Sequence, residues 1–185
     1  MRVVAGKYKG RRLISPDGTD VRPTSSKVKE AVFSMLTGYL EDAIVIDLFC
    51  GTGSLGIEAL SRGAQRCYFC DILPSSIALL NENLTHIKVP PKDAIVLRGD
   101  FRRTARIAGE KIQVGADIVF ADPPYSAGFE KEIMQTLAGC GIMKSGGLLL
   151  LEHAIERSPE LNAEGFERIR VKRYGKTGIC LFQKN

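Results

Sequence analysis

Residues 44–56, Ile-Val-Ile-Asp-Leu-Phe-Cys-Gly-Thr-Gly-Ser-Leu-Gly, decide the fold of this chain. An apolar run with β-branched residues ends at Asp47, passes through glycines, and opens into a helix expected from about residue 55 to 61. Glycines allow positive φ and let backbone N–H groups approach a bound molecule, and the positive end of the helix points at the same place. The stretch therefore predicts a strand, a tight ligand-holding loop and a helix.

The ligand of this loop stays open at this point. The spacing Gly51-x-Gly53-x-x-Gly56 also fits the dinucleotide fingerprint. A nicotinamide or flavin nucleotide and S-adenosylmethionine are therefore alternatives, and the rest of the chain has to separate them.

Outward from the loop, strand and helix patterns alternate. Strands are expected at 66–71, 94–98, 116–121 and 148–152, helices at about 74–87 and 129–137, and a polar, helix-compatible stretch runs to residue 111. This alternation predicts a Rossmann-like α/β fold, with a mostly parallel sheet and helices on both faces. The end differs, because residues 166–174 and 178–183, joined by Gly-Lys-Thr, predict a closing antiparallel strand pair.

The first forty residues predict an extension ahead of this core. Residues 1–14 have the pattern of a β-hairpin that turns at residues 6–10, and apolar positions from 28 to 36 keep helical spacing. We expect a basic hairpin and helix at 1–40 and a cofactor-binding core at 41–185, within one structural domain.

Composition bounds the class of protein. The 185 residues are 44% hydrophobic, as in an ordinary globular domain, and neither a membrane span nor a signal-peptide apolar region is apparent, so a cytoplasmic monomer is expected. Five cysteines at irregular spacing indicate reduced thiols. Cys67 and Cys70 fall in an expected strand, where residues three apart face opposite sides, so we predict no metal site.

The net charge of +5 is concentrated at the start of the chain. Residues 1–30 hold eight Lys or Arg against three acids, whereas the other 155 residues balance at 18 against 18. A basic segment on a neutral body indicates a face that meets a polyanion such as nucleic acid, although a solvated basic extension is the alternative.

Acids follow each of the first four expected strands. In a doubly wound sheet ligands bind at the carboxyl ends of the strands, where these side chains lie. The acids are Asp47, Asp71, Asp100 and Asp122. A carboxylate at the position of Asp71 can accept bonds from both ribose hydroxyls, but a nicotinamide enzyme would show the same residue.

The sequence Asp122-Pro123-Pro124-Tyr125 separates the two kinds of ligand. Two prolines fix the backbone and lack N–H groups, so the carbonyls and the Asp122 carboxylate form a rigid row of acceptors, and Tyr125 offers a flat surface. Such a row suits the exocyclic amine of a base whose ring stacks on an aromatic side chain. This favours methyl transfer to an amine over hydride transfer, with a plain turn after the strand as the alternative.

These motifs resemble class I S-adenosylmethionine-dependent amino-methyltransferases, and the chain resembles the RsmD family in particular. The resemblance rests on Asp-Leu-Phe-Cys-Gly-Thr-Gly from residue 47, Asp-Pro-Pro-Tyr from 122, Arg-Val-Val-Ala-Gly from 2, Arg-Pro-Thr from 22, Gly-Ile-Glu-Ala-Leu-Ser-Arg-Gly-Ala from 56 and Arg-Tyr-Gly-x-Thr from 173. That family methylates a guanine N2 of bacterial 16S ribosomal RNA, which implies this RNA as partner, within a small-subunit particle.

The resemblance also implies roles for individual residues. Asp47, Gly51 and Gly53 would hold the methionine end of S-adenosylmethionine, Asp71 its ribose and Asp100 the adenine amine. Asp122, Pro123, Pro124 and Tyr125 would meet the target base. We expect the basic residues of the extension to grip flanking phosphates, namely Lys7, Lys9, Arg11, Arg12 and Arg22.

Several alternatives stay open on the residues alone. A DNA or RNA adenine-N6 methyltransferase would share the Asp-Pro-Pro-Tyr chemistry, a nicotinamide oxidoreductase would share the glycine loop, and a non-catalytic RNA-binding protein would share the charge. Asp47 or Asp100 could instead cap a helix or turn. Cys50 is the candidate for a nucleophilic thiol, and the simpler interpretation of His153 is a structural hydrogen-bond partner.

Overall fold

The computed structural model describes residues 1–15, 26–124, 128–157, 162–163 and 165–185. The helices are α1 (Ser26–Met35), α2 (Ser54–Ser61), α3 (Pro74–His86), α4 (Phe101–Lys111), α5 (Glu130–Gly139) and a short 3-10 turn η1 (Ile155–Arg157). The strands are β1 (Ile44–Leu48), β2 (Arg66–Asp71), β3 (Ala94–Arg98), β4 (Ala116–Ala121), β5 (Met143–Ala154), β6 (Asn162–Ala163), β7 (Phe166–Tyr174) and β8 (Thr177–Lys184). Arg22 and Tyr125, for which the sequence predicts roles, lie outside the described residues.

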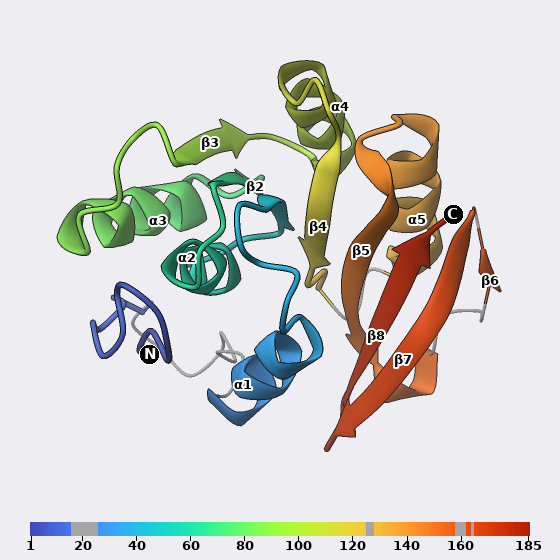
Figure 1. The fold of residues 1–185 in the computed structure, drawn as a ribbon, viewed down its shortest axis with the longest axis horizontal. Helices are drawn as coiled ribbons and strands as arrows, with labels where there is room; N and C mark the ends of the chain where they lie inside the picture. Colours follow the sequence, from blue (N-terminus) through green and yellow to red (C-terminus); the bar gives the residue numbers. More distant parts are fainter. Residues whose placement is uncertain (16–25, 125–127, 158–161, 164) are drawn as a thin grey trace.

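One sheet organises the molecule (Figure 1), with the strand order β3-β2-β1-β4-β5-β8-β7-β6. The first five positions are parallel, and β8, β7 and β6 continue the sheet in antiparallel pairs. The chain reverses its direction of winding between β1 and β4, which makes their carboxyl ends the topological switch point. The predicted Rossmann-like fold is therefore confirmed.

Two differences from the expected strands concern the second half of the sheet. β5 begins five residues earlier than expected, and its pairing with β4 shifts register between Met143 and Leu148. β6 adds a two-residue strand outside the predicted pair. Gly146 and Gly147 interrupt the apolar pattern of β5, so the pattern did not predict the first half of this strand.

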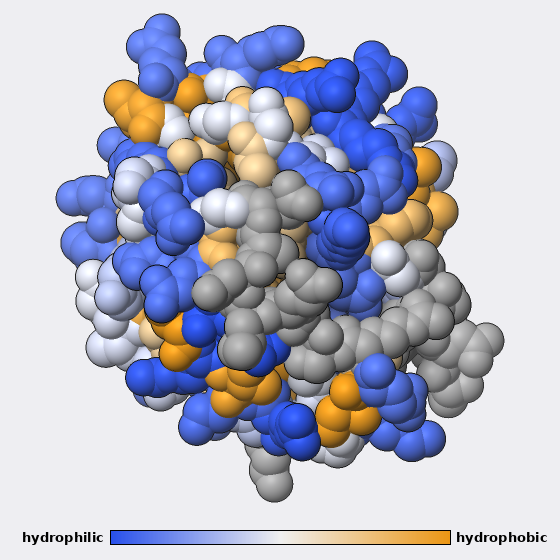
Figure 2. Space-filling model, turned by 90° about the vertical axis from the view of Figure 1, so that its right-hand side faces the viewer, coloured by the Kyte–Doolittle hydropathy of each residue, from blue (hydrophilic) through white to orange (hydrophobic). Residues whose placement is uncertain are grey.

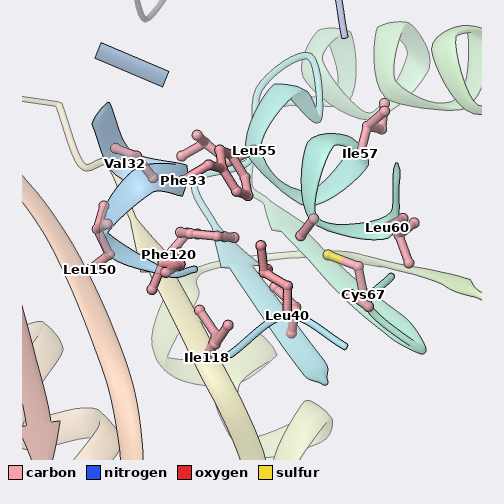
Figure 3. Packing of buried hydrophobic residues seen from close by; sticks show 14 of the residues in the cluster. Val32, Phe33, Leu40, Leu55, Ile57, Leu60, Cys67, Ile118, Phe120 and Leu150 are labelled. Atoms are coloured by element: carbon pink, nitrogen blue, oxygen red, sulfur yellow. The ribbon is translucent and has the colours of Figure 1, made fainter. Parts of the chain in front are cut away.

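Both faces of the sheet are covered by helices. Residues of α1, α2 and α3 pack on one face in a single apolar cluster, while α4 and α5 pack on the other. Figure 3 shows the first face, where Phe33 of α1 meets Phe120 of β4 with ring centroids 5.7 Å apart. Cys67 belongs to the first cluster and Cys70 to the second, so the prediction that they face opposite sides is confirmed.

Residues 1–15, called the N-terminal loop from here on, form less β-structure than the hairpin pattern predicted. One antiparallel bridge joins Arg2 to Arg12. The loop is fixed instead by α2, because the Glu58 carboxylate accepts hydrogen bonds from the N–H groups of Val4 and Ala5 at 2.8 and 2.9 Å. Its apolar side chains Val3, Tyr8 and Leu13 lie in the same core cluster as α1, α2 and α3.

A buried ion pair completes this anchor. Lys29 and Glu58 are both fully buried, their Nζ and Oε2 atoms lie 3.2 Å apart, and Lys29 also donates to the Arg2 carbonyl at 2.6 Å. Arg62 adds a 2.8 Å ion pair to the other Glu58 oxygen. Among the described helices, none is both long and apolar enough to cross a membrane.

Candidate active site

The loop after β1 is shaped by residues in the left-handed region. Phe49, Gly51 and Gly53 have φ of 62°, 52° and 79°. The chain thereby turns sharply into α2, and the Gly56 N–H in the first turn of that helix donates to Asp47 Oδ2 at 2.8 Å. The buried Asp47 carboxylate thus ties the end of β1 to the start of α2, as the capping alternative foresaw.

The three glycines of the loop serve different purposes. A Cβ at Gly56 would lie 2.3 Å from Phe69, and one at Gly53 would lie 2.4 Å from Leu80, so both positions are filled by packing. A Cβ at Gly51 would meet nothing within 4 Å. Gly51 is therefore the glycine whose backbone borders open space at the switch point, where a ligand can approach.

Asp71 lies beside Gly51. Its Oδ2 accepts from the Gly51 N–H at 2.9 Å, and its Oδ1 accepts from the Leu73 N–H at 2.9 Å. Each carboxylate oxygen can accept a second bond. The carboxylate is thus held in place with acceptor capacity left for hydroxyl groups.

Asp100 caps α4, as the helix-cap alternative allows. Its side chain accepts from the Arg102 N–H at 2.9 Å, and its Oδ2 forms a 2.8 Å ion pair with the Arg102 guanidinium. The same guanidinium pairs with Glu132 of α5 at 2.5 Å, so Asp100 also takes part in joining α4 to α5. The role of Asp100 at an adenine amine stays a prediction.

Asp122 follows β4 at the switch point. Leu48 pairs with Ala121 and Ala121 pairs with Leu151, so Asp122 lies between the strand ends that carry Phe49 and Glu152. Pro123 is buried and Pro124 is exposed, which places the pair at the surface boundary of the site. The structure thereby brings Asp47, Gly51, Asp71 and Asp122 to one edge of the sheet.

The carboxyl groups at this edge are buried close to one another, so a bound positive charge would favour their ionised forms. Burial, opposed by the bond from Gly56 and aided by the charge of Asp71, raises the pKa of Asp47 to about 7. Burial and the neighbouring carboxylates of Glu152 and Asp47 raise the pKa of Asp122 well above its usual value. S-adenosylmethionine carries a sulfonium and an ammonium, so this set of acids beside the open face of Gly51 fits it.

An aromatic cluster that sequence reasoning did not name borders the same edge. The rings of Phe49, Phe101 and Phe129 have centroids 5.2 to 6.3 Å apart. The Arg102 guanidinium lies 4.4 Å from the centroid of Phe101 and 5.5 Å from that of Phe129. Phe49 and Phe101 each follow directly on a strand-end motif, which is the signal that would have found them.

Cys50 and His153 contribute structure. Burial and nearby Asp47 and Asp71 raise the pKa of the Cys50 thiol well above its usual value, which disfavours a thiolate nucleophile. His153 is buried; its Nδ1 lies 2.8 Å from the Ala154 carbonyl oxygen and its Nε2 lies 3.3 Å from Cys180 Sγ. The interpretation of His153 as a structural hydrogen-bond partner agrees with these contacts.

The basic residues of the N-terminal loop divide into two kinds. Lys7 lies 4.0 Å from Asp93, and Arg11 donates to the Ile87 carbonyl while its guanidinium lies over the Tyr8 ring. Lys9 and Arg12 are exposed and form no ion pair with another described residue.

The sheet order, the glycine loop and the acids at the strand ends define a class I methyltransferase, and solved structures agree. The Escherichia coli protein yhhF superposes with a TM-score of 0.85 at 29% identity, covering 100% of this chain and 98% of that one. SMU.776, solved with SAH, shares the fold at a TM-score of 0.66 and 14% identity, over 83% of this chain and 48% of its own.

The family follows from the sequence comparison. The model of the family described as conserved hypothetical protein 95 matches residues 1–183, so the chain belongs to this family, the RsmD family. YlbH of Bacillus subtilis, provisionally named an rRNA methyltransferase, is 35% identical over 100% of this chain and 99% of its own. Ribosomal RNA small subunit methyltransferase D of Escherichia coli is 29% identical over 100% and 90%.

Family membership confirms part of the sequence interpretation. The chain is an S-adenosylmethionine-dependent methyltransferase, as the Asp-Pro-Pro-Tyr motif predicted, and the nicotinamide alternative is wrong. The predicted cofactor is confirmed at the level of the family. The assignments of single residues to its parts stay predictions.

Proposed function

We propose that the chain transfers a methyl group from S-adenosylmethionine to the exocyclic N2 amine of a guanine in 16S ribosomal RNA of the small subunit. The observation that carries the proposal is the position of Asp122 and its two prolines, beside the carboxyl end of β1 and the glycine loop. The names of relatives in Escherichia coli and Haemophilus influenzae, ribosomal RNA small subunit methyltransferase D, support the choice of RNA.

In this proposal the two sides of the switch point have separate tasks. Asp47, Gly51 and Gly53 border the methionine end of the cofactor, Asp71 receives the ribose hydroxyls and Asp100 lies at the adenine. The open space beside Gly51 and the acceptor capacity left on Asp71 support this division. Asp122, Pro123, Pro124 and Tyr125 face the target base.

The cofactor supplies, when bound, a methyl group activated by a positive sulfur. The chain has to place the amine in line with it, a task worth up to ~7–11 kcal/mol through proximity and orientation. The Asp122 carboxylate and the Pro123 carbonyl would accept the two amine N–H bonds and direct the nitrogen lone pair toward the methyl group. Because its pKa is raised, Asp122 can also take up the proton that the amine releases.

The target nucleotide has to leave its stack, because the guanine N2 group lies in the minor groove and a site at a sheet edge cannot reach it in a duplex. We therefore propose an unpaired or extruded guanine, bound by a monomer acting on a small-subunit particle in the cytoplasm. The exposed cations Lys9 and Arg12 are suited to hold the neighbouring phosphates, together with Lys7, Arg11 and Arg22.

An adenine-N6 methyltransferase is the second candidate, because the same row of acceptors would serve the adenine amine. The test is to incubate the protein with methyl-labelled S-adenosylmethionine and small-subunit RNA, then digest the RNA and separate the nucleosides. We expect label in N2-methylguanosine. Label in N6-methyladenosine would establish the second candidate, and no label in RNA or in small-subunit particles would refute both.

A variant ties the reaction to the proposed site. Asp122→Ala should lower kcat by about 100-fold or more, as loss of a transition-state acceptor does, while the dissociation constant of S-adenosylmethionine changes little. Glu82→Ala, an exposed carboxylate on α3, is the matched control and should keep full activity. Near-normal turnover by Asp122→Ala would show that Asp122 does not position the base.

A further inference from the structure

A second basic region lies within the 155 residues after position 30, whose charges balance as a whole. The segment Phe-Glu-Arg-Ile-Arg-Val-Lys-Arg-Tyr-Gly-Lys-Thr, residues 166–177, contains five Lys or Arg and one acid. It comprises β7 and the turn into β8, and these two strands with their turn are called the C-terminal hairpin from here on. The catalytic proposal leaves this hairpin without a role in binding.

Strand register places the basic end of this hairpin at the edge of the active site. Ala121 pairs with Leu151, so Asp122 and Glu152 share one row, in which Glu152 pairs with Ile179 and Ile179 pairs with Lys172. Lys172 therefore lies three interstrand spacings from the row position of Asp122, or roughly 14 Å. Arg173 and the turn extend further in the direction of the active site's edge, and Figure 1 shows this tip beyond the ends of β4 and β5.

The cations at this end are available to a ligand. Four of them are exposed and form no ion pair within 4 Å with another described residue: Arg170, Lys172, Arg173 and Lys176. Some basic side chains elsewhere have acidic partners, as Arg102 does with Asp100 and Glu132. Four unpaired positive charges on one hairpin cost repulsion that an anionic ligand relieves.

The C-terminal hairpin is held in place by the core of the protein. β8 is buried along most of its length and pairs with β5 over seven residues, and Tyr174 packs against the core cluster that contains α1. Only β7 turns its side chains outward, with Ile169 and Val171 exposed beside the cations. Figure 2 shows the side of the molecule on which β6 and β7 lie, where hydrophilic residues surround scattered hydrophobic ones.

We propose that the tip of the C-terminal hairpin binds the phosphate backbone of the RNA on the side of the target nucleotide away from the N-terminal loop. The inference rests on the proposed function, because it takes the RNA as substrate. Arg170 and Lys172 share one face of β7 and can meet successive phosphates, and Arg173 and Lys176 extend the positive charge to the tip, whereas a protein partner would find few apolar contacts there. The two basic regions then hold the RNA on either side of an acidic centre that receives only the base.

The test compares two variants of equal charge. The hairpin variant carries Arg170→Gln, Lys172→Gln, Arg173→Gln and Lys176→Gln. The control carries Lys88→Gln, Lys92→Gln, Arg106→Gln and Lys111→Gln, exposed cations that precede β3 or lie on α4. Binding to a transcript of small-subunit RNA and to purified small-subunit particles is measured over a range of salt, with urea unfolding to verify the fold and calorimetry for S-adenosylmethionine.

The hairpin variant should bind the transcript at least tenfold more weakly at 0.1 M salt, and the slope of log K against log salt should fall by about 2 to 3, near 0.7 for each phosphate that is no longer neutralised. The control should keep more of the slope, and cofactor affinity should be equal in both. An equal slope in the two variants would overturn the proposal, as would weaker binding to particles alone, which would indicate a ribosomal protein. A parent protein that neither binds nor methylates the RNA would refute the proposed function instead.

Discussion

The two basic regions of the chain are built in opposite ways. The N-terminal loop has little regular structure and is fixed by a buried network in which Glu58 bonds two of its N–H groups and pairs with Lys29. The C-terminal hairpin is a regular strand pair whose cations reach solvent. The charge along the sequence is densest in the first region, yet its Lys7 and Arg11 are engaged with Asp93 and with the Ile87 carbonyl of the protein itself.

The difference shows that a basic composition has two physical origins. Near the start of the chain, Arg11 of the N-terminal loop and Lys29 of α1 partly serve to close the fold, because the first donates to the Ile87 carbonyl and the second to the Arg2 carbonyl and pairs with Glu58. In the hairpin, backbone pairing and the burial of β8 hold the strands, and the charges of β7 remain for a ligand. Replacing cations that are engaged with the protein should therefore affect stability, whereas replacing the exposed cations should affect binding.

The largest effect is expected from Glu58→Ala. Removal of this carboxylate leaves Lys29 buried without its partner and frees the N–H groups of Val4 and Ala5, which should lower the free energy of unfolding by about 3–5 kcal/mol. Urea unfolding measures the change, and trypsin should cleave faster at Lys7 and Lys9. Glu82→Ala is the control, expected within ~0.5 kcal/mol of the parent.

A stable Glu58→Ala variant with an unchanged rate of cleavage would contradict the view that the buried Glu58 network fixes the N-terminal loop. The N-terminal loop would then be held by its apolar side chains alone. The double replacement Lys29→Met with Glu58→Leu sharpens the test. Replacing both partners of a buried ion pair by apolar groups costs far less stability than removing one partner and leaving the other charge buried.

The turn glycines of the two regions give the next largest effect. Gly6 has φ of 80° and a Cβ there would lie 1.7 Å from the Ser61 carbonyl oxygen, so Gly6→Ala should cost roughly 2–4 kcal/mol. Gly175 has φ of 60° with nothing within 4 Å of an added Cβ, so Gly175→Ala should cost only about 1 kcal/mol of left-handed strain. Equal losses in urea unfolding would mean that the loop moves away from α2 freely.

Sequence patterns predicted the sheet well and the anchoring poorly, for physical reasons. Hydrophobic periodicity is local, and it located β2, β3, β4 and β7 at their observed bounds. The Glu58–Lys29 pair joins residues 29 positions apart, and a charged pattern on a helix ordinarily indicates a solvated face. Only the packed structure shows that these two charges are inside.

The same limit applied to the site. Acids after successive strands pointed to one edge, because parallel strands bring their carboxyl ends together, and the structure places Asp47 and Asp122 there. The basic end of β7 could not be assigned to that edge, since its distance from Asp122 depends on the pairing of β5 with β8. The aromatic contact of Phe49 with Phe129 was hidden for the same reason.

The acids at the strand ends of the active site add a pH dependence. The pKa of Asp47 is raised from an ordinary 3.8 to about 7, so the unfolded chain releases this proton at lower pH than the folded protein does. The free energy of unfolding of the cofactor-free protein should therefore fall as the pH rises from 4 to 7, by roughly 1 kcal/mol per pH unit from this group. Urea unfolding of the parent and of Asp47→Asn measures it, and the variant should lose that part of the fall. Parallel pH profiles would contradict a protonated Asp47.

The smallest effect separates the cations within the N-terminal loop. Lys9 and Arg12 are exposed without an ion pair among the described residues, so Lys9→Gln with Arg12→Gln should lower the salt slope of RNA binding by about 1.5 at unchanged stability. Lys7→Gln with Arg11→Gln removes the same charge but also the bond to Ile87 and the contacts with Tyr8, so it should lower stability by about 1 kcal/mol and the slope by less. If both pairs lowered the slope equally at equal stability, engagement with the protein would not decide which cations meet the RNA, and the contrast with the C-terminal hairpin would reduce to a count of charges.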